Sequence, residues 1–249
     1  MSKNSLDLPK KDFEKLLNKS TELVLEQFEN LELLKGFNSY SQQEYESWFD
    51  EKLPQNGMDD YELLKEVKEK VLKTATGNLG TNMYAYVMAG GTQISIIAEK
   101  LAATINQNTG KWHLAPAICE IEKRVLQWGA EMLGIEESVG GVLVSGGSAA
   151  NLAGLTVARN IFFEQQNIRK KGLFGMKPFT VYASREVHGC VDKSLEILGI
   201  GTNNLRKIET NSNFTINLES LENQINTDIE NGFLPFCLIG NAGTVNTGA

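Results

Sequence analysis

The sequence has few of the residues that build disulfide frameworks or metal sites. It contains two histidines and three cysteines, Cys119, Cys190 and Cys237, in 249 residues. The cysteines are odd in number and far apart, and no two of them form a CxxC pair. We therefore expect neither a disulfide framework nor structural zinc, and we predict no metal site. This use of cysteine is typical of a protein of the reducing cytoplasm.

Long apolar runs and an excess of positive charge are also lacking. No run approaches the ~18 residues that a membrane span requires, and the first residues lack the apolar centre of a secretory signal. Lys and Arg total 24 against 31 Asp and Glu, which gives a net charge of -7. An acidic chain is not drawn to phosphate backbones or anionic lipid, so nucleic-acid and membrane partners are not expected. With 41% hydrophobic and 22% charged residues, the composition predicts a folded, soluble protein.

Glycine is scarce in the first 75 residues, which hold only Gly36 and Gly57 of the 23 glycines but 27 of the 55 charges. Apolar residues recur there at helical spacing over 13–34 and 63–72. Ser41, followed three residues later by Glu44, predicts a capping box at the start of a short helix. We predict a helical N-terminal arm over residues 1–77, which packs either on its own domain or on a second subunit.

The rest of the chain has the pattern of an α/β domain, which we place over residues 78–249. Helical spacing continues over 94–105 and 118–132, the second helix opened by Pro116. After Gly140, short apolar runs at 141–145, 179–183, 205–208 and 234–240 alternate with helical patterns at 148–168, 187–198 and 217–230. Gly199 and Gly232 stand where the last two helices should end. Strands separated by helices predict a mostly parallel sheet covered on both faces.

The segment GGVLVSGGSAANLAGLTVAR, residues 140–159, predicts a strand, a tight turn and a helix. Gly146 and Gly147 lack the Cβ atoms that would keep an anion from the backbone, Ser148 offers a hydroxyl, and the helix presents unpaired N–H groups. This arrangement suits a phosphate group.

A P-loop is disfavoured because Gly147 stands where its lysine is required, and a dinucleotide fingerprint lacks its third glycine and its acid. A hydrolase elbow, nearly matched at Gly146, Ser148 and Ala150, and a capped turn without any ligand remain as alternatives.

Two other strand ends carry polar residues. His188 follows the apolar run 179–183 and begins the next helix, and Thr244 lies in the polar turn after 234–240. Because the carboxyl ends of parallel strands meet at one edge of a sheet, we expect both residues to lie near the turn at Gly146. A lone histidine in this position is more often a helix cap or a surface group than a ligand.

Four segments in order resemble group II pyridoxal-phosphate-dependent amino-acid decarboxylases, the family of aromatic-amino-acid and glutamate decarboxylases. WHLAPAICEIE, from Trp112 to Glu122, resembles the family's W-x-x-S-P-A-x-x-E-x-E, and SGGSAAN resembles its S-G-G-S-E-A-N. HGCVDK, from His188, and GNAGTVNTGA, which ends at Ala249, resemble two later cofactor segments. The resemblance covers about residues 78–249.

The resemblance implies a type I fold with pyridoxal 5'-phosphate as cofactor. It implies an L-amino acid as substrate, with aromatic amino acids as first choice. It also implies a homodimer in which the N-terminal arm packs on the partner. Carried over by position, Gly146, Gly147 and Ser148 would hold the cofactor phosphate. His188 would be catalytic, with its imidazole stacked on the pyridine ring so that the ring system can accept the electrons left by departing carbon dioxide. Thr244 would contact the cofactor from the neighbouring strand end. Tyr86, in NMYAYVMAGG, would help to line the substrate pocket.

The chain departs from the family pattern in two ways. Ala149 replaces a glutamate, and Ala115 a serine. The family's aspartate for the pyridine nitrogen and its Schiff-base lysine follow the equivalent of Ala249, so the resemblance implies the N-terminal portion of a longer enzyme, with an incomplete cofactor domain that is inactive alone. The alternatives are a serine hydrolase using Ser148 and His188, and a non-catalytic partner that binds the cofactor.

Overall fold

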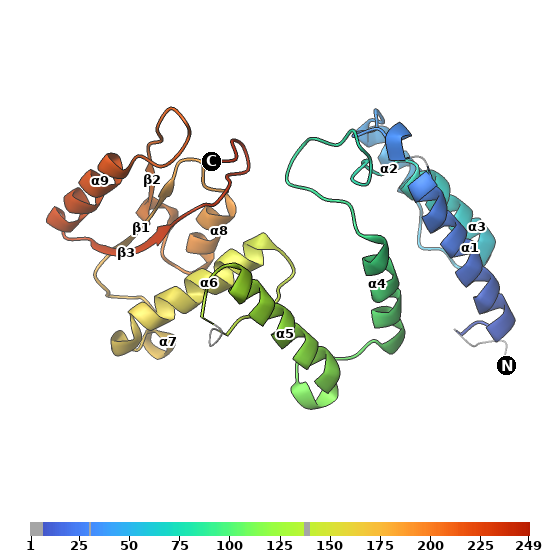
Figure 1. The fold of residues 1–249 in the computed structure, drawn as a ribbon, viewed down its shortest axis with the longest axis horizontal. Coiled ribbons are helices and arrows are strands. Elements are labelled where there is room, and N and C mark those ends of the chain that lie inside the picture. Colours follow the sequence, from blue (N-terminus) through green and yellow to red (C-terminus); the bar gives the residue numbers. More distant parts are fainter. Residues whose placement is uncertain (1–6, 30, 137–139) are drawn as a thin grey trace. The chain divides into compact units, whose positions relative to one another are not determined.

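The computed structural model describes residues 7–29, 31–136 and 140–249 (Figure 1). It divides into two compact units, Met1–Asn106 and Gln107–Ala249. The predicted division after residue 77 falls inside the first unit, and the predicted domains stay a prediction. Within the described residues, no helix is both long and apolar enough to cross a lipid bilayer.

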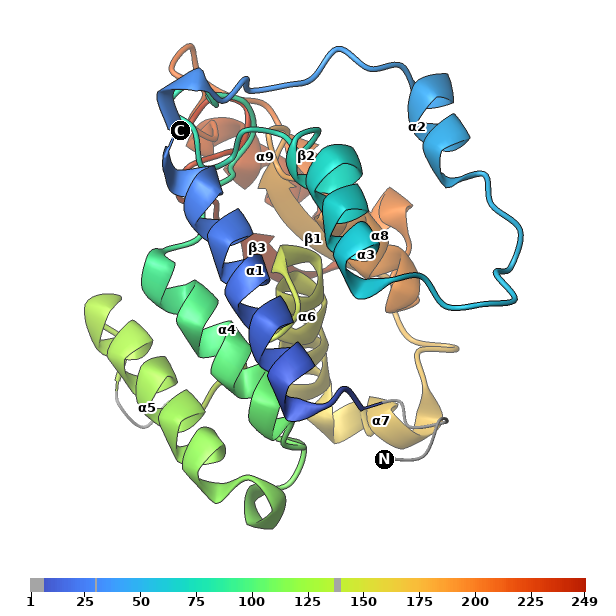
Figure 2. The same cartoon turned by 90° about the vertical axis from the view of Figure 1, so that its right-hand side faces the viewer.

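The first unit is helical. Its helices are α1 (Lys10–Glu29), α2 (Gln42–Phe49), α3 (Asp60–Glu66) and α4 (Gln93–Ile105), with a 3-10 turn, η1 (Leu31–Leu33), and a π-helical turn, η2 (Val67–Leu72). Helix α1 lies beside α3 and α4 (Figure 2). The predicted helical spacing is confirmed, although the second predicted helix changes to π geometry after Glu66.

The capping box at the start of α2 is confirmed. The Ser41 hydroxyl accepts the backbone N–H of Glu44 at 3.3 Å, and the Glu44 carboxylate accepts the backbone N–H of Ser41 at 2.7 Å. The hydrogen bond from the Ser41 backbone lowers the pKa of Glu44 below its usual value. Two orphan donors of the first turn are thereby satisfied.

The second unit is an α/β unit. It begins with η3 (Trp112–Leu114) and α5 (Pro116–Met132), which has Pro116 in its first turn as predicted. The order then runs α6 (Gly147–Phe162), η4 (Glu164–Gln166), α7 (Ile168–Lys171), β1 (Phe179–Ser184), α8 (Cys190–Ile197), η5 (Thr202–Asn204), β2 (Leu205–Ile208), α9 (Leu218–Glu230) and β3 (Leu234–Ile239). Gly199 and Gly232 follow α8 and α9 with φ of 70° and 84°, as expected of glycines at helix ends.

The sheet has the order β2-β1-β3, and β1 pairs with both neighbours in parallel, which confirms the predicted topology. Two expectations were wrong. Residues 141–145 form no strand, because no described segment pairs with them, and Val142 and Leu143 are 63% and 59% exposed. The helix expected over 148–168 ends at Phe162, and the chain turns through η4 to Asn167, whose φ is 57°.

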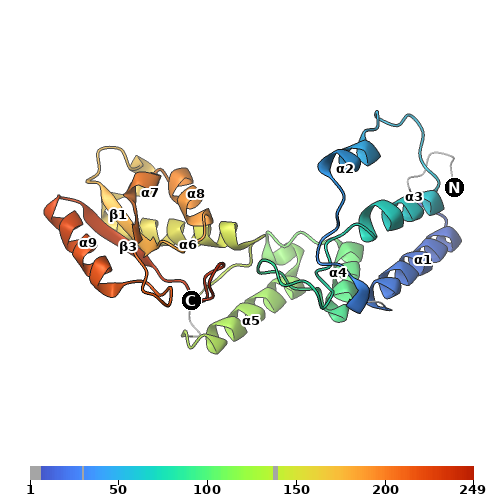
Figure 3. The same ribbon diagram turned by 90° about the horizontal axis from the view of Figure 1, so that it is seen from above.

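Both faces of the sheet are covered (Figure 3). On one face, Val181 and Ala183 of β1 pack with side chains of α6 and α8, such as Leu155 and Leu195. On the other face, Tyr182 packs with Ile208 and with Leu221 of α9. All three strands run in one direction, so the segments after β1 and β3 leave from the same edge.

A buried polar cluster attaches α9 to the sheet. The Tyr182 hydroxyl donates to Asp228 Oδ2 at 2.9 Å and lies 2.7 Å from Thr180 Oγ1. Arg206 donates to both Asp228 oxygens at 2.8–3.0 Å and lies 5.0 Å from the centre of the Phe233 ring. Burial raises the pKa of Tyr182. Burial also acts to raise the pKa of Asp228, but hydrogen bonds from Arg206 and Tyr182 outweigh it and hold that pKa below its usual value.

Candidate functional site

The N-terminus of α6 is an open turn of glycines. Gly146 has φ 154° and ψ 171°, a conformation that L side chains rarely adopt, and it gives the helix no side-chain cap. A Cβ atom built on Gly146 or Gly147 would meet no atom within 4 Å, so the space before the first turn is open. Ser148 is exposed beside it. Uncapped N–H groups, the positive helix end and a hydroxyl are the chemistry that binds a phosphate.

The chain that leads into this turn is held by α5. Glu122 Oε1 accepts the backbone N–H of Leu143 at 3.1 Å, and Glu120 Oε1 accepts the indole N–H of Trp112 at 2.9 Å. The two glutamates of the segment from Trp112 to Glu122 therefore have separate structural tasks. One fixes the indole at the start of α5, and the other fixes the approach to Gly146.

His188 lies between the end of β1 and the start of α8, and its side chain is exposed. Its Nδ1 atom accepts the backbone N–H of Cys190 at 3.1 Å. Because a backbone N–H can only donate, Nδ1 carries no proton, and the proton of the neutral ring is on Nε2. The ring therefore has an accessible surface and a defined tautomer.

The amide of Asn151 brings the glycine turn and the His188 segment together. Its Nδ2 atom donates to the carbonyl oxygen of Gly147 at 2.9 Å and to Cys190 Sγ at 3.5 Å. The first turn of α6 and the first residue of α8 are thus bound to the same nitrogen. Sequence reasoning assigned no role to Asn151 or Cys190. The available signal was the four-residue spacing from Gly147 to Asn151, which brings a side chain back to the first turn of its own helix.

Thr244 lies in the turn after β3 and is 8% exposed. Its Oγ1 atom lies 2.6 Å from that of Thr247. It lines a cavity of about 290 Å³ together with Ser184, the last residue of β1. Thr244 therefore lies near the carboxyl edge of the sheet, on the side where Leu221 of α9 also lines the cavity, and its expected place near the turn at Gly146 stays a prediction.

Tyr86 belongs to the first unit, where its ring makes an edge contact with Phe37 at 6.4 Å between centroids. It is 75% exposed and has a φ of 63°, which is uncommon for a residue with a side chain. Its expected place in a substrate pocket stays a prediction.

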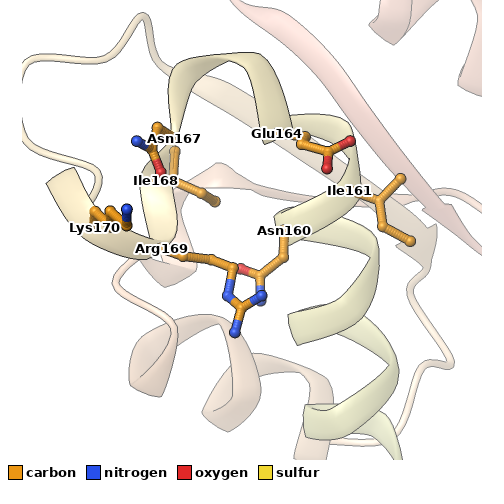
Figure 4. A pocket seen from close by; sticks show the side chains of 7 residues that line it. All are labelled: Asn160, Ile161, Glu164, Asn167, Ile168, Arg169 and Lys170. Atoms are coloured by element: carbon orange, nitrogen blue, oxygen red, sulfur yellow. The ribbon is translucent and has the colours of Figure 1, made fainter.

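A cavity of about 540 Å³ lies at the far end of α6 (Figure 4). Seven residues line it: Asn160, Ile161, Glu164, Asn167, Ile168, Arg169 and Lys170. With a rise of about 1.5 Å per residue, Asn160 lies roughly 20 Å along the helix from Gly147. This cavity is therefore separate from the glycine turn.

The tautomer of His188 argues against the serine hydrolase alternative. In a Ser-His-Asp triad, the Nδ1–H group of the histidine donates to a carboxylate. The unprotonated Nε2 atom then accepts the proton of the serine hydroxyl. In this chain Nδ1 is the acceptor, so Nε2 holds the proton and cannot act as that base. The arrangement is the reverse of the one that would activate Ser148.

Comparison with known proteins agrees with the geometry. Residues 43–249 match the family model described as "Pyridoxal-dependent decarboxylase conserved domain". The chain belongs to this family. It is 30% identical over 249 residues to an aromatic-L-amino-acid decarboxylase of Bacillus atrophaeus, and 30% identical over 191 residues, 74% of this chain and 37% of the relative, to tyrosine decarboxylase 4 of Petroselinum crispum.

Among solved structures, that of Oryza sativa TDC with PLP and tryptamine matches with a TM-score of 0.88 at 21% identity, over 99% of this chain and 52% of that one. The likeness shows that this chain has the type I fold that was predicted. The Bacillus alignment covers 100% of this chain but 50% of the relative. The chain thus spans about half the length of that relative.

Proposed function

We propose that this chain supplies the phosphate-binding turn and the stacking histidine of a longer pyridoxal-phosphate-dependent enzyme that decarboxylates an L-amino acid, with aromatic amino acids as the preferred class. The observation that carries the proposal is the hydrogen-bonded link from Gly147 through Asn151 to Cys190, next to His188. It supports a single binding place for a phosphate and a flat ring. The named relatives support the aromatic class.

The residues at this place fit the cofactor. The open, uncapped start of α6 accommodates a phosphate group, with N–H donors and the Ser148 hydroxyl, at Gly146 and Gly147. The exposed imidazole of His188 offers a flat surface for a pyridine ring. Pyridoxal phosphate held there would supply an electron sink for the decarboxylation of an amino acid. Thr244 would make its contact from the turn after β3, and Tyr86 would line the substrate side.

In this proposal, the residues of the chain hold and orient the cofactor. Gly146 lets the backbone approach the phosphate, and Ser148 adds a hydrogen bond. His188 keeps the ring plane fixed, with its own proton on Nε2. The lysine and the aspartate that complete this chemistry are not among these residues, so we expect no turnover by the 249-residue chain.

Cofactor binding tests the proposal. We expect the chain to bind pyridoxal phosphate more tightly than pyridoxal, which lacks the phosphate, when both are titrated by fluorescence quenching. Ser148→Ala should weaken the binding of pyridoxal phosphate by about tenfold, because a hydrogen bond to a charged group is lost. Ser47→Ala, on exposed α2, is the matched control and should bind as the wild type does.

Equal affinity for the two compounds would contradict the phosphate site. Steady release of carbon dioxide from an L-amino acid by the 249-residue chain would contradict the expected inactivity. Binding without turnover by the full-length parent protein as well would favour the non-catalytic partner instead.

We further propose that the parent protein is a homodimer in which helices of the first unit are covered by the partner. Support comes from α4, where an apolar stripe of Ile94, Ile97, Leu101 and Ile105 is 54–70% exposed. In sedimentation experiments on the parent protein, Ile97→Lys should reduce self-association. Glu99→Lys changes a residue of the same helix outside the apolar stripe and should leave self-association unchanged. Equal sedimentation of the two variants would contradict this assignment.

A further inference from the structure

The amide orientation of Asn151 is fixed by its partners. The carbonyl oxygen of Gly147 can only accept, so the atom that faces it at 2.9 Å is the NH₂ nitrogen. The second hydrogen of this nitrogen is then available to Cys190 Sγ, 3.5 Å away. Asn151 is half-buried and Cys190 is 6% exposed, so the contact lies at the packed surface between α6 and α8.

Cys190 serves two partners with two different groups. Its thiol sulfur accepts the Asn151 amide, and its backbone N–H donates to His188 Nδ1. N–H groups in the first turn of a helix have no partner within the helix, so this donor is free to serve a side chain. The position of Cys190 therefore determines where the His188 ring is held and which of its two nitrogens is unprotonated.

We propose that Asn151 is a positioning residue that acts through Cys190 to hold His188 beside the glycine turn as the Nε2–H tautomer. Any hydrogen bond that His188 makes to a bound molecule is then a donation from Nε2–H to an acceptor atom. The use of this arrangement in decarboxylation rests on the proposed function, whereas the link itself is a property of the chain.

The link can be tested without cofactor by nuclear magnetic resonance of the ¹⁵N-labelled 249-residue chain. There are two histidines, so His113→Gln assigns the imidazole signals of His188. We expect Nδ1 without a proton and Nε2 with one. We also expect Asn151→Leu to speed the exchange of the residue 190 backbone N–H by about tenfold, which corresponds to about 1.4 kcal/mol of lost protection.

Three variants complete the test. Asn160→Leu places the same substitution at another half-buried position of α6 and should leave this exchange rate unchanged. Cys190→Ser keeps an acceptor and should preserve the protection. Cys190→Ala removes the acceptor but keeps the N–H, and should act in the same direction as Asn151→Leu, which keeps the test valid if the asparagine variant does not fold.

A protonated Nδ1 in the wild type would overturn the proposal, and so would unchanged exchange in both Asn151→Leu and Cys190→Ala. These results do not depend on cofactor or turnover. Failure of the link and failure of the decarboxylase assignment are therefore distinguishable, because the titration with pyridoxal phosphate reports on the latter alone.

Discussion

The two units of the chain bury their apolar residues to very different extents. Among the described residues of the first unit, Leu23 is the one buried apolar side chain, whereas α4 exposes a whole stripe of aliphatic residues. In the second unit, all six residues of β1 are buried between two layers of helices. A large aliphatic side chain contributes about 1.5–3 kcal/mol when it is fully buried. The second unit therefore has a core of its own, whereas the first unit buries little of its apolar surface within itself.

The largest expected effect that would test this contrast is in the core of the second unit. Leu195 is fully buried, so Leu195→Ala should lower the free energy of unfolding by about 4 kcal/mol through lost burial and a cavity. Leu101→Ala, at a 62% exposed position of α4, should change it by less than about 0.5 kcal/mol. Urea unfolding followed by circular dichroism measures both. Similar losses in the two variants would mean that the units do not differ in this way.

A somewhat smaller effect is expected at the polar cluster under α9. Asp228→Ala leaves Arg206 and the Tyr182 hydroxyl without their shared acceptor, at a cost of about 3 kcal/mol. The control is Asp192→Ala, which removes a more exposed ion pair to Lys207 and should cost less than about 1 kcal/mol. The same unfolding measurement applies, and equal costs would show that burial of the cluster contributes nothing.

The contribution of Asp228 should also depend on pH. Its pKa is lower in the folded state than in the unfolded chain, so the unfolded state binds the proton more readily. The stabilisation is complete above the unfolded pKa of about 3.9 and is lost as the pH falls through the lower folded pKa. The difference in stability between the wild type and Asp228→Asn should therefore shrink in this acid range. A difference that is constant from pH 6 to pH 2 would exclude the linkage.

The smallest effect is expected in the first unit. Ser41→Ala removes the cap of α2 and should destabilise that helix by about 1 kcal/mol. The loss should appear as faster hydrogen exchange in α2 with little change in the second unit. Ser47→Ala, within the same helix, is the control and should leave the exchange of the first turn as it is.

Local patterns predicted most of the elements. Pro116 marked the start of α5, the Ser41–Glu44 spacing marked the cap of α2, and runs of apolar residues marked β1, β2 and β3. These signals are local because capping, helical periodicity and β propensity act over a few residues. The run at 141–145 had the same apolar pattern but is no strand, because a strand also needs a neighbour with which to pair.

The contacts between elements could not be predicted in this way. Asn151 and Cys190 are 39 residues apart, and Tyr182 and Asp228 are 46 apart. Nothing in the spacing of either pair indicates that the two side chains meet. Their contact depends on how the helices pack against one another and on the sheet. Sequence reasoning placed Gly146, His188 and Thr244 at the ends of their elements, but the residues that hold two of these segments together required the structure.

Gly146 shows that backbone handedness can restrict a position that has ample room. An L-alanine methyl group would collide with nothing there, yet the dihedral angles suit the mirror-image amino acid. Chemical synthesis could therefore place D-alanine at this turn with less strain than its natural enantiomer. A substitution scan that uses only the genetically encoded L-amino acids would find this position intolerant of every side chain, whatever its size.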